Sequence, residues 1–172
     1  MNEGILVACI GNIFLGDDGF GFEVAQALAG CALPAGVEVR DYGIRGLDLA
    51  YALLRPWRAV ILVDAIVRGG VPGTVYLLQP ERSDAEAAGV DPHGMDPVRV
   101  LATARSLGEV SAEIFIVGGE PQDFGDEMEG RMGLSPALRA AIPEAVRMVQ
   151  QLAERLASDA IPEMAASSGG KR

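Results

Sequence analysis

The stretch "GILVACIGNIFLGDDGFGFEVAQALAG", residues 4–30, decides the fold of this chain. Its first part, residues 4–10, is an uninterrupted apolar run, which is typical of a strand buried on both faces of a sheet. From Phe20 onward, apolar side chains recur at helical spacing up to Gly30. The stretch therefore predicts a strand, a glycine-rich turn and a helix, which together open an α/β unit.

The rest of the chain continues the alternation of strands and helices. Further strands are expected at 37–43, 59–66, 74–80 and 113–119, and further helices at 47–54, 96–108 and from 136 to about 157. Asp96 caps the helix at 96–108, Pro97 takes its first position and Gly108 ends it, whereas Pro143 should kink or divide the last helix.

This pattern predicts an α/β protein, a three-layer α/β/α sandwich around a mostly parallel twisted sheet of about five strands. The strand at 74–80 should lie at or near an edge. Residues 1–157 are expected to form a single domain, and residues 158–172 a flexible tail, because the last stretch is small, polar and aperiodic.

The composition of the chain excludes some kinds of binding partner. The 172 residues carry a formal net charge of −10, which argues against a nucleic-acid partner, since such binding depends on clustered Lys and Arg. The two cysteines, Cys9 and Cys31, lie far apart and support neither a disulfide framework nor a structural zinc site. No apolar run is long enough for a membrane span. We expect a cytoplasmic protein with no membrane partner, acting as a monomer.

The glycine-rich turn raises a question of charge. Gly11 and Gly16 have the spacing of a phosphate-binding loop, but Asp17 and Asp18 stand where that loop needs Lys and Ser or Thr. Two carboxylates would repel a phosphate. The dinucleotide fingerprint also fails, because Val24 stands in place of its last glycine. The loop is suited to a positively charged group.

Residues that follow the strands are the best candidates for chemistry, because ligands of open α/β sheets bind at the carboxyl ends of strands. Asp18 and Asp64 follow adjoining strands, and His93, the only histidine, lies in a loop just before a helix. Two oxygen ligands and an imidazole would make an open site for a divalent transition metal. The other residues after strands are Asn12, Asp17, Asp41, Gly118, Gly119 and Glu120.

Plainer interpretations of the same residues stay open. Asp17 and Asp18 could cap the first helix, Asp41 could be a turn residue and His93 an ordinary surface histidine. Other catalytic classes lack their signatures: the chain has no H-E-x-x-H or G-x-S-x-G motif, and neither cysteine has the surroundings of an activated thiolate.

Several motifs together resemble one known family. The stretches "GNIFLGDDGFGFEVAQAL", "VEVRDYGIRGLDLAYAL", "AVILVDAI" and "PHGMDP", in this order, resemble the hydrogenase maturation proteases over roughly residues 4 to 157. The chain departs from the family pattern at Tyr42-Gly43, where many relatives have a glycine pair, and in the turn after the strand at 113–119.

The resemblance implies an aspartyl-type endopeptidase in which Asp18, Asp64 and His93 contact metal and carry the reaction. It implies as partner the large-subunit precursor of a [NiFe] hydrogenase, from which a C-terminal extension is removed. Nickel would be supplied mainly by the precursor, and no organic cofactor is expected. Client specificity is expected in the loop 81–92 and in the stretch 121–133.

Two other functions stay open. The protein could be a metal-binding hydrogenase assembly factor without proteolytic activity. It could also be a small α/β hydrolase that uses Asp18 and Asp64 with Mg²⁺ on phosphorylated metabolites.

Overall fold

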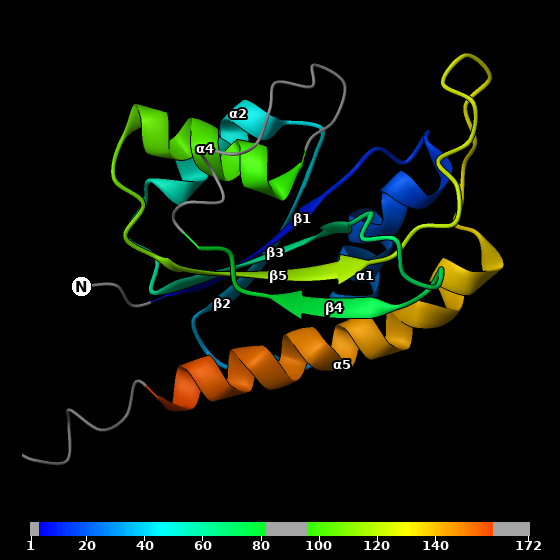
Figure 1. The fold of residues 1–172 in the computed structure, drawn as a ribbon. Coiled ribbons are helices and arrows are strands. Elements are labelled where there is room, and N and C mark those ends of the chain that lie inside the picture. Colours follow the sequence, from blue (N-terminus) through cyan, green and yellow to red (C-terminus); the bar gives the residue numbers. More distant parts are fainter. Residues whose placement is uncertain (1–3, 82–95, 160–172) are drawn as a thin grey trace, which may run out of the picture.

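The computed structural model describes residues 4–81 and 96–159. Figure 1 shows a central sheet with helices on both faces. The strands are β1 (Ile5–Ile10), β2 (Val37–Gly43), β3 (Ala59–Ala65), β4 (Val75–Leu78) and β5 (Glu113–Gly119). The helices are the short 3₁₀ helix η1 (Gly16–Gly19) and the α-helices α1 (Phe20–Leu28), α2 (Gly46–Leu53), α4 (Pro97–Leu107) and α5 (Pro136–Ser158).

The sheet is mostly parallel. Its strand order is β2-β1-β3-β5-β4, and only β4, at one edge, runs antiparallel to its neighbour. Cys9 of β1 pairs with Val63 of β3, and Asp64 pairs with Gly118 of β5. The carboxyl ends of β1, β3 and β5 therefore lie side by side at one end of the sheet.

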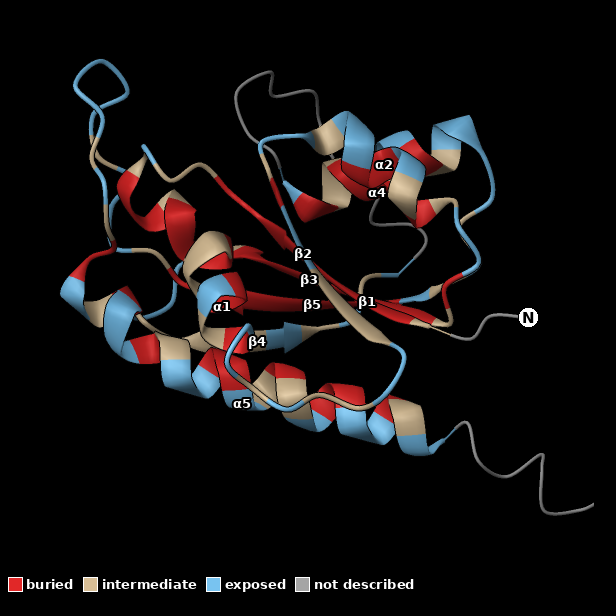
Figure 2. Cartoon of the chain, turned by 180° about the vertical axis from the view of Figure 1, so that it is seen from behind, coloured by how far each residue is buried: buried red, intermediate tan, exposed pale blue. Residues whose placement is uncertain are grey.

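Alternate residues of the central strands belong to two separate hydrophobic cores. In β1, Ile5, Val7 and Cys9 pack with α1 and α5, whereas Leu6, Ala8 and Ile10 pack with α2 and α4 on the other face. Each face of a strand points into its own hydrophobic layer because side chains alternate across a sheet. Figure 2 shows the central strands buried and the helices buried only on the side that faces the sheet. The predicted three-layer α/β/α sandwich is confirmed.

The expected elements agree with the structure to within a few residues, with two differences. The first helix ends at Leu28 rather than Gly30. Of the two predicted effects of Pro143, a kink or a division of the last helix, the division is wrong, because α5 runs as one helix from Pro136 to Ser158. Pro143 lies on the exposed face of α5, where water can bond the carbonyl that its missing N–H leaves free.

A long excursion separates β5 from α5. Residues 120–135 leave the end of β5, project beyond the sheet and return to start α5 at Ser135, which caps the helix by accepting a hydrogen bond from the Leu138 N–H. The excursion passes the glycine-rich turn, where Leu15 and Arg131 form a parallel bridge. In the part of the chain that the structure describes, no helix is long and apolar enough to cross a membrane.

Candidate functional site

The structure places Asp18 and Asp64 at the same end of the sheet. Asp64 is the penultimate residue of β3, and Asp18 lies in η1, directly after the loop that leaves β1. Their charges are close enough for Asp18 to raise the pKa of Asp64. Asp18 and Asp64 thus lie at the ends of adjoining strands, β1 and β3, as expected.

Asp64 is the more buried of the two carboxylates, with 2% of its surface exposed. Burial raises its pKa well above the ordinary value, and the carboxylates of Asp18 and Asp96 raise it further, against one hydrogen bond from the Ala65 N–H at 2.8 Å. A carboxyl group in these surroundings takes up a proton more readily than one in water.

Asp18 is half-buried, and its backbone and side chain are both fixed. Burial raises its pKa, opposed by the N–H of Asn12, which donates to Asp18 Oδ2 at 3.0 Å. Gly11 packs so closely that a Cβ atom there would overlap the Asp18 carbonyl oxygen and lie 3.8 Å from Asp64 Oδ1. The glycine is what allows the two acids to approach around the end of β1.

Each acid keeps one carboxylate oxygen to which no described residue donates a hydrogen bond, namely Oδ1 of Asp18 and Oδ2 of Asp64. These two oxygens could face a cation or a water molecule. Within residues 4–81 and 96–159, no group of three His, Cys, Asp or Glu side chains is placed to hold a metal ion. His93 lies outside the described residues, so its predicted place in the site remains a prediction.

Asp17 has a role that was not predicted from the sequence. It is fully buried and accepts hydrogen bonds from the N–H groups of Gln122, Asp123 and Ser135 and from the Ser135 hydroxyl. Burial alone would raise its pKa, but these donors lower it. Neither aspartate caps α1 through its side chain, because α1 begins at the N-cap Gly19 without a side-chain cap.

The remaining residues at this end of the sheet have structural roles. Glu120 is buried and accepts hydrogen bonds from the N–H groups of Arg68 and Gly69 and from the Tyr76 hydroxyl, so it holds the loop between β3 and β4. Asp41 is exposed and accepts from the Gly43 N–H, which agrees with a turn residue. Cys9 is buried, and burial, Asp41 and Asp64 all raise the pKa of its thiol, so it is not an activated nucleophile.

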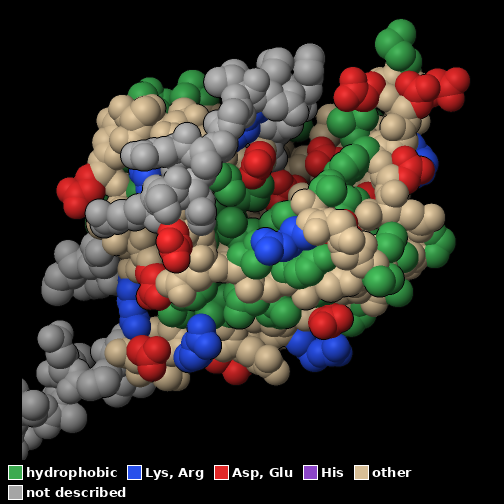
Figure 3. All heavy atoms as spheres, viewed as in Figure 1, with side chains coloured by type: hydrophobic (Ala, Val, Ile, Leu, Met, Phe, Trp, Pro, Cys, Tyr) green, Lys and Arg blue, Asp and Glu red, His purple; other side chains and the backbone are tan. Residues whose placement is uncertain are grey.

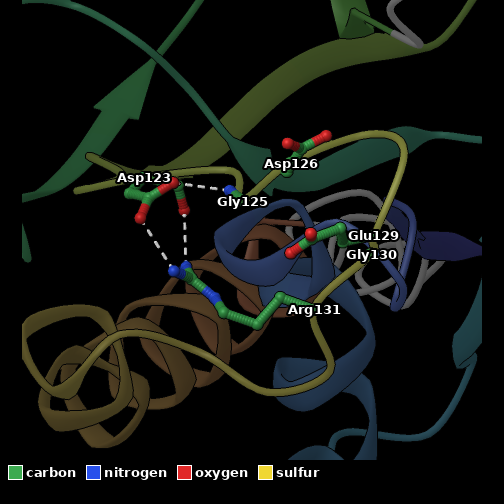
Figure 4. Close-up of a pocket in the computed structure, with 6 residues that line it drawn as sticks. All are labelled: Asp123, Gly125, Asp126, Glu129, Gly130 and Arg131. Atoms are coloured by element: carbon green, nitrogen blue, oxygen red, sulfur yellow. Dashed lines mark hydrogen bonds and ion pairs between the residues drawn. The ribbon is translucent and has the colours of Figure 1, made fainter.

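The excursion 120–135 forms a polar wall beside the site. Asp123 and Arg131 form an ion pair of 2.7 Å (Figure 4), and they line a hollow together with Gly125, Asp126, Glu129 and Gly130. Met128 at its tip is 93% exposed. Figure 3 shows Asp and Glu side chains gathered on the projecting segment and in the depression next to it. This segment overlaps the stretch 121–133 that we expect to contribute to client specificity.

Comparison with known proteins identifies the class. A family model described as hydrogenase maturation protease matches residues 22–152. The hydrogenase 2 maturation protease of Escherichia coli K12 is 32% identical over 164 residues, covering 94% of this chain and 97% of the relative. The hydrogenase expression/formation protein HupD of Rhodobacter capsulatus is 32% identical over 151 residues, covering 84% and 70%.

The fold gives the same result. The structure of the E. coli hydrogenase maturating endopeptidase HybD superposes with a TM-score of 0.74 at 30% identity, covering 88% of this chain and 93% of that one. The protein is therefore a peptidase built on an α/β sandwich with an acidic pair at the carboxyl end of its sheet. It belongs to the hydrogenase maturation protease family, and its activity is that of a hydrogenase maturation endopeptidase.

Proposed function

We propose that this endopeptidase removes a C-terminal extension from the nickel-loaded large-subunit precursor of a [NiFe] hydrogenase. The observation that carries the proposal is the carboxylate pair. Asp18 and Asp64 come from different strand ends, lie close enough to interact electrostatically, and each keep one oxygen that accepts no hydrogen bond from a described residue. This is an arrangement from which a peptidase can act on a bond brought to the end of the sheet.

The pair has the chemistry of an acid–base site. A carboxylate that is ionised can take a proton from water, and a neighbouring carboxyl that holds its proton can donate one to the leaving amine. The surroundings favour a protonated Asp64, because its carboxyl group is buried and a second carboxylate also raises its pKa. We assign to Asp18 and Asp64 the positioning and deprotonation of the attacking water, and we class the enzyme as aspartyl-type.

Nickel belongs to the substrate in this proposal. The described residues offer two such carboxylate oxygens, too few to hold the ion alone, so in this proposal the precursor brings most of its ligands, and a weak contact from Asp18 and Asp64 suffices to recognise a loaded client. When bound, the ion serves as a docking point and can help to polarise a nearby carbonyl.

We propose His93 as the third residue of the site. It precedes by three residues Asp96, whose carboxylate is near enough to Asp64 to raise its pKa. An imidazole nitrogen is a suitable ligand for a divalent transition metal and a possible partner for the scissile carbonyl. The two free thiols, Cys9 and Cys31, fit a reducing compartment, and on that ground we place the enzyme in the cytoplasm.

The test uses the purified full chain and a large-subunit precursor prepared with and without nickel. The mass of the precursor is followed with time by mass spectrometry. We expect loss of a C-terminal fragment from the loaded precursor alone. Equal cleavage of both forms would refute the gating role of nickel, and an intact loaded precursor from every client tested would refute the proposed substrate.

The same experiment separates the two alternatives. An assembly factor without proteolytic activity would bind the loaded precursor and leave its mass unchanged. A magnesium-dependent hydrolase would release phosphate from small phosphorylated metabolites whether or not nickel is present. The family assignment favours the peptidase over both.

A further inference from the structure

We propose that Asp17 is a positioning residue for the cleavage reaction, which sets Asp18 in place by tying the turn that carries it to the excursion 120–135. The inference rests on the proposed function, because it takes Asp18 as a catalytic residue. Asp17 itself is fully buried, and all the hydrogen bonds that its carboxylate accepts from described residues come from the excursion.

The contacts of Asp17 join parts of the chain that are far apart in sequence. Its Oδ1 accepts from the Ser135 N–H at 2.6 Å. Its Oδ2 accepts from the N–H groups of Gln122 at 2.8 Å and Asp123 at 3.2 Å and from the Ser135 hydroxyl at 2.8 Å. One carboxylate therefore holds both ends of the excursion, where it leaves β5 and where it enters α5.

Backbone bonds reinforce the same junction. The Gly16 N–H donates to the Arg131 carbonyl and the Arg131 N–H donates to the Phe14 carbonyl, both at 2.7 Å, and the Asp17 N–H donates to the Asp123 carbonyl. On its other side the turn is held by Gly11, which packs on the Asp18 backbone, and by the Asn12 N–H, which donates to the Asp18 side chain. Asp18 is thus clamped between β1 and the excursion.

The chemistry of the junction requires an ionised acid. All the groups that Asp17 contacts through its carboxylate are donors, and they engage both of its oxygens. An asparagine at this position has one acceptor oxygen and one NH₂ group, so one side of the junction would face donor against donor. The isosteric change Asp17→Asn therefore breaks the junction without changing its size.

The experiment compares Asp17→Asn, Ser135→Ala and Ser135→Thr with the unmodified enzyme on the loaded precursor. Single-turnover cleavage and precursor affinity are measured separately, at a temperature where circular dichroism shows each variant folded. We expect cleavage by Asp17→Asn to fall by about 100-fold, since a misplacement of about 1 Å can cost that factor, with affinity changed less than about threefold. Ser135→Ala should be slower by about tenfold, and Ser135→Thr, which keeps the hydroxyl, should recover.

Leu53→Ala is the control for loss of stability. Leu53 is fully buried in α2, in the core on the face of the sheet opposite α5, so this variant should unfold more easily but cleave at the normal rate when folded. A purely structural role for Asp17 would give the same result for Asp17→Asn. Cleavage within about threefold of normal by folded Asp17→Asn would overturn the inference.

Two further results would also decide between the proposals. If Asp17→Asn does not fold, equal rates for Ser135→Ala and Ser135→Thr would overturn the inference. Asp18→Asn is included so that the two proposals can fail separately. An active Asp18→Asn variant refutes the proposed function, whereas an inactive Asp18→Asn beside a fully active Asp17→Asn refutes only the positioning role.

Discussion

Gly11 gives the most detailed prediction, because its backbone and its surroundings both exclude a side chain. Its φ of +143° is a conformation that L-residues rarely adopt, and an added Cβ would overlap the Asp18 carbonyl oxygen. The overlapped atom is backbone and cannot swing away as a side chain could. Gly11→Ala must therefore either move the turn that carries Asp18 or distort the end of β1.

The expected cost has two parts. A strained backbone conformation costs about 1–3 kcal/mol, and an atom forced into a packed region costs about another 1–3 kcal/mol, so we expect destabilisation of about 2–6 kcal/mol. For a chain of this size that lowers the unfolding midpoint by about 4–24 °C. Processing should fall far more than stability explains, because the displaced atom belongs to Asp18.

Gly69→Ala is the matched control. Gly69 also has a positive φ, +76°, but no atom lies within 4 Å of the position its Cβ would take. Only the backbone term applies, about 1–2 kcal/mol, and processing should be kept. Thermal unfolding and precursor cleavage are measured on both variants. If Gly11→Ala is as stable as Gly69→Ala, or if it processes the precursor at the normal rate, the close approach at Gly11 does not hold Asp18.

Two further predictions concern Asp64 and Pro143. The raised pKa of Asp64 means that the folded chain holds this proton more tightly than the unfolded one, so wild-type stability falls as pH rises from the ordinary value of 3.8 through the raised pKa. The side chain of Asp64→Asn cannot ionise, so its free energy of unfolding in urea should rise relative to that of the wild type as pH increases from about 4. A difference in free energy that shrinks as pH increases would contradict the burial argument. Pro143→Ala restores an N–H to the exposed face of α5 and should stabilise the protein by about 1–3 kcal/mol. A proline inside a helix costs about 3 kcal/mol, and the stabilisation that it gives by stiffening the unfolded chain is smaller than this cost. A lower unfolding midpoint for Pro143→Ala would show that α5 is adapted to the proline.

The central strands and the acidic pair could be predicted because their signals are local. The runs at 5–10, 59–63 and 114–117 are apolar on both faces, as strands between two helical layers must be. Since parallel strands end at one edge of the sheet, Asp64 after one run and Asp18 after another had to lie near each other. Helix α4 could be predicted for the same reason, because Asp96, Pro97 and Gly108 mark its two ends within one short stretch of sequence.

The role of Asp17 could not be predicted, because its partners are far away in the sequence. Asp17 is followed after 105, 106 and 118 residues by Gln122, Asp123 and Ser135. The sequence around Asp17 itself is also compatible with a helix cap. The course of α5 through Pro143 depends in the same way on tertiary packing. Its other face is buried along its length against the sheet, which outweighs the local cost of the proline.

The measurement that tests the central claim most directly is precursor cleavage by the Asp64→Asn and Asp18→Asn variants. Each variant is incubated with the nickel-loaded precursor, and the precursor mass is compared with that produced by the wild type, after thermal unfolding has shown that each variant is folded. The carboxylate pair predicts an intact precursor with both variants. Full processing by folded Asp64→Asn would contradict the assignment of this pair as the catalytic site.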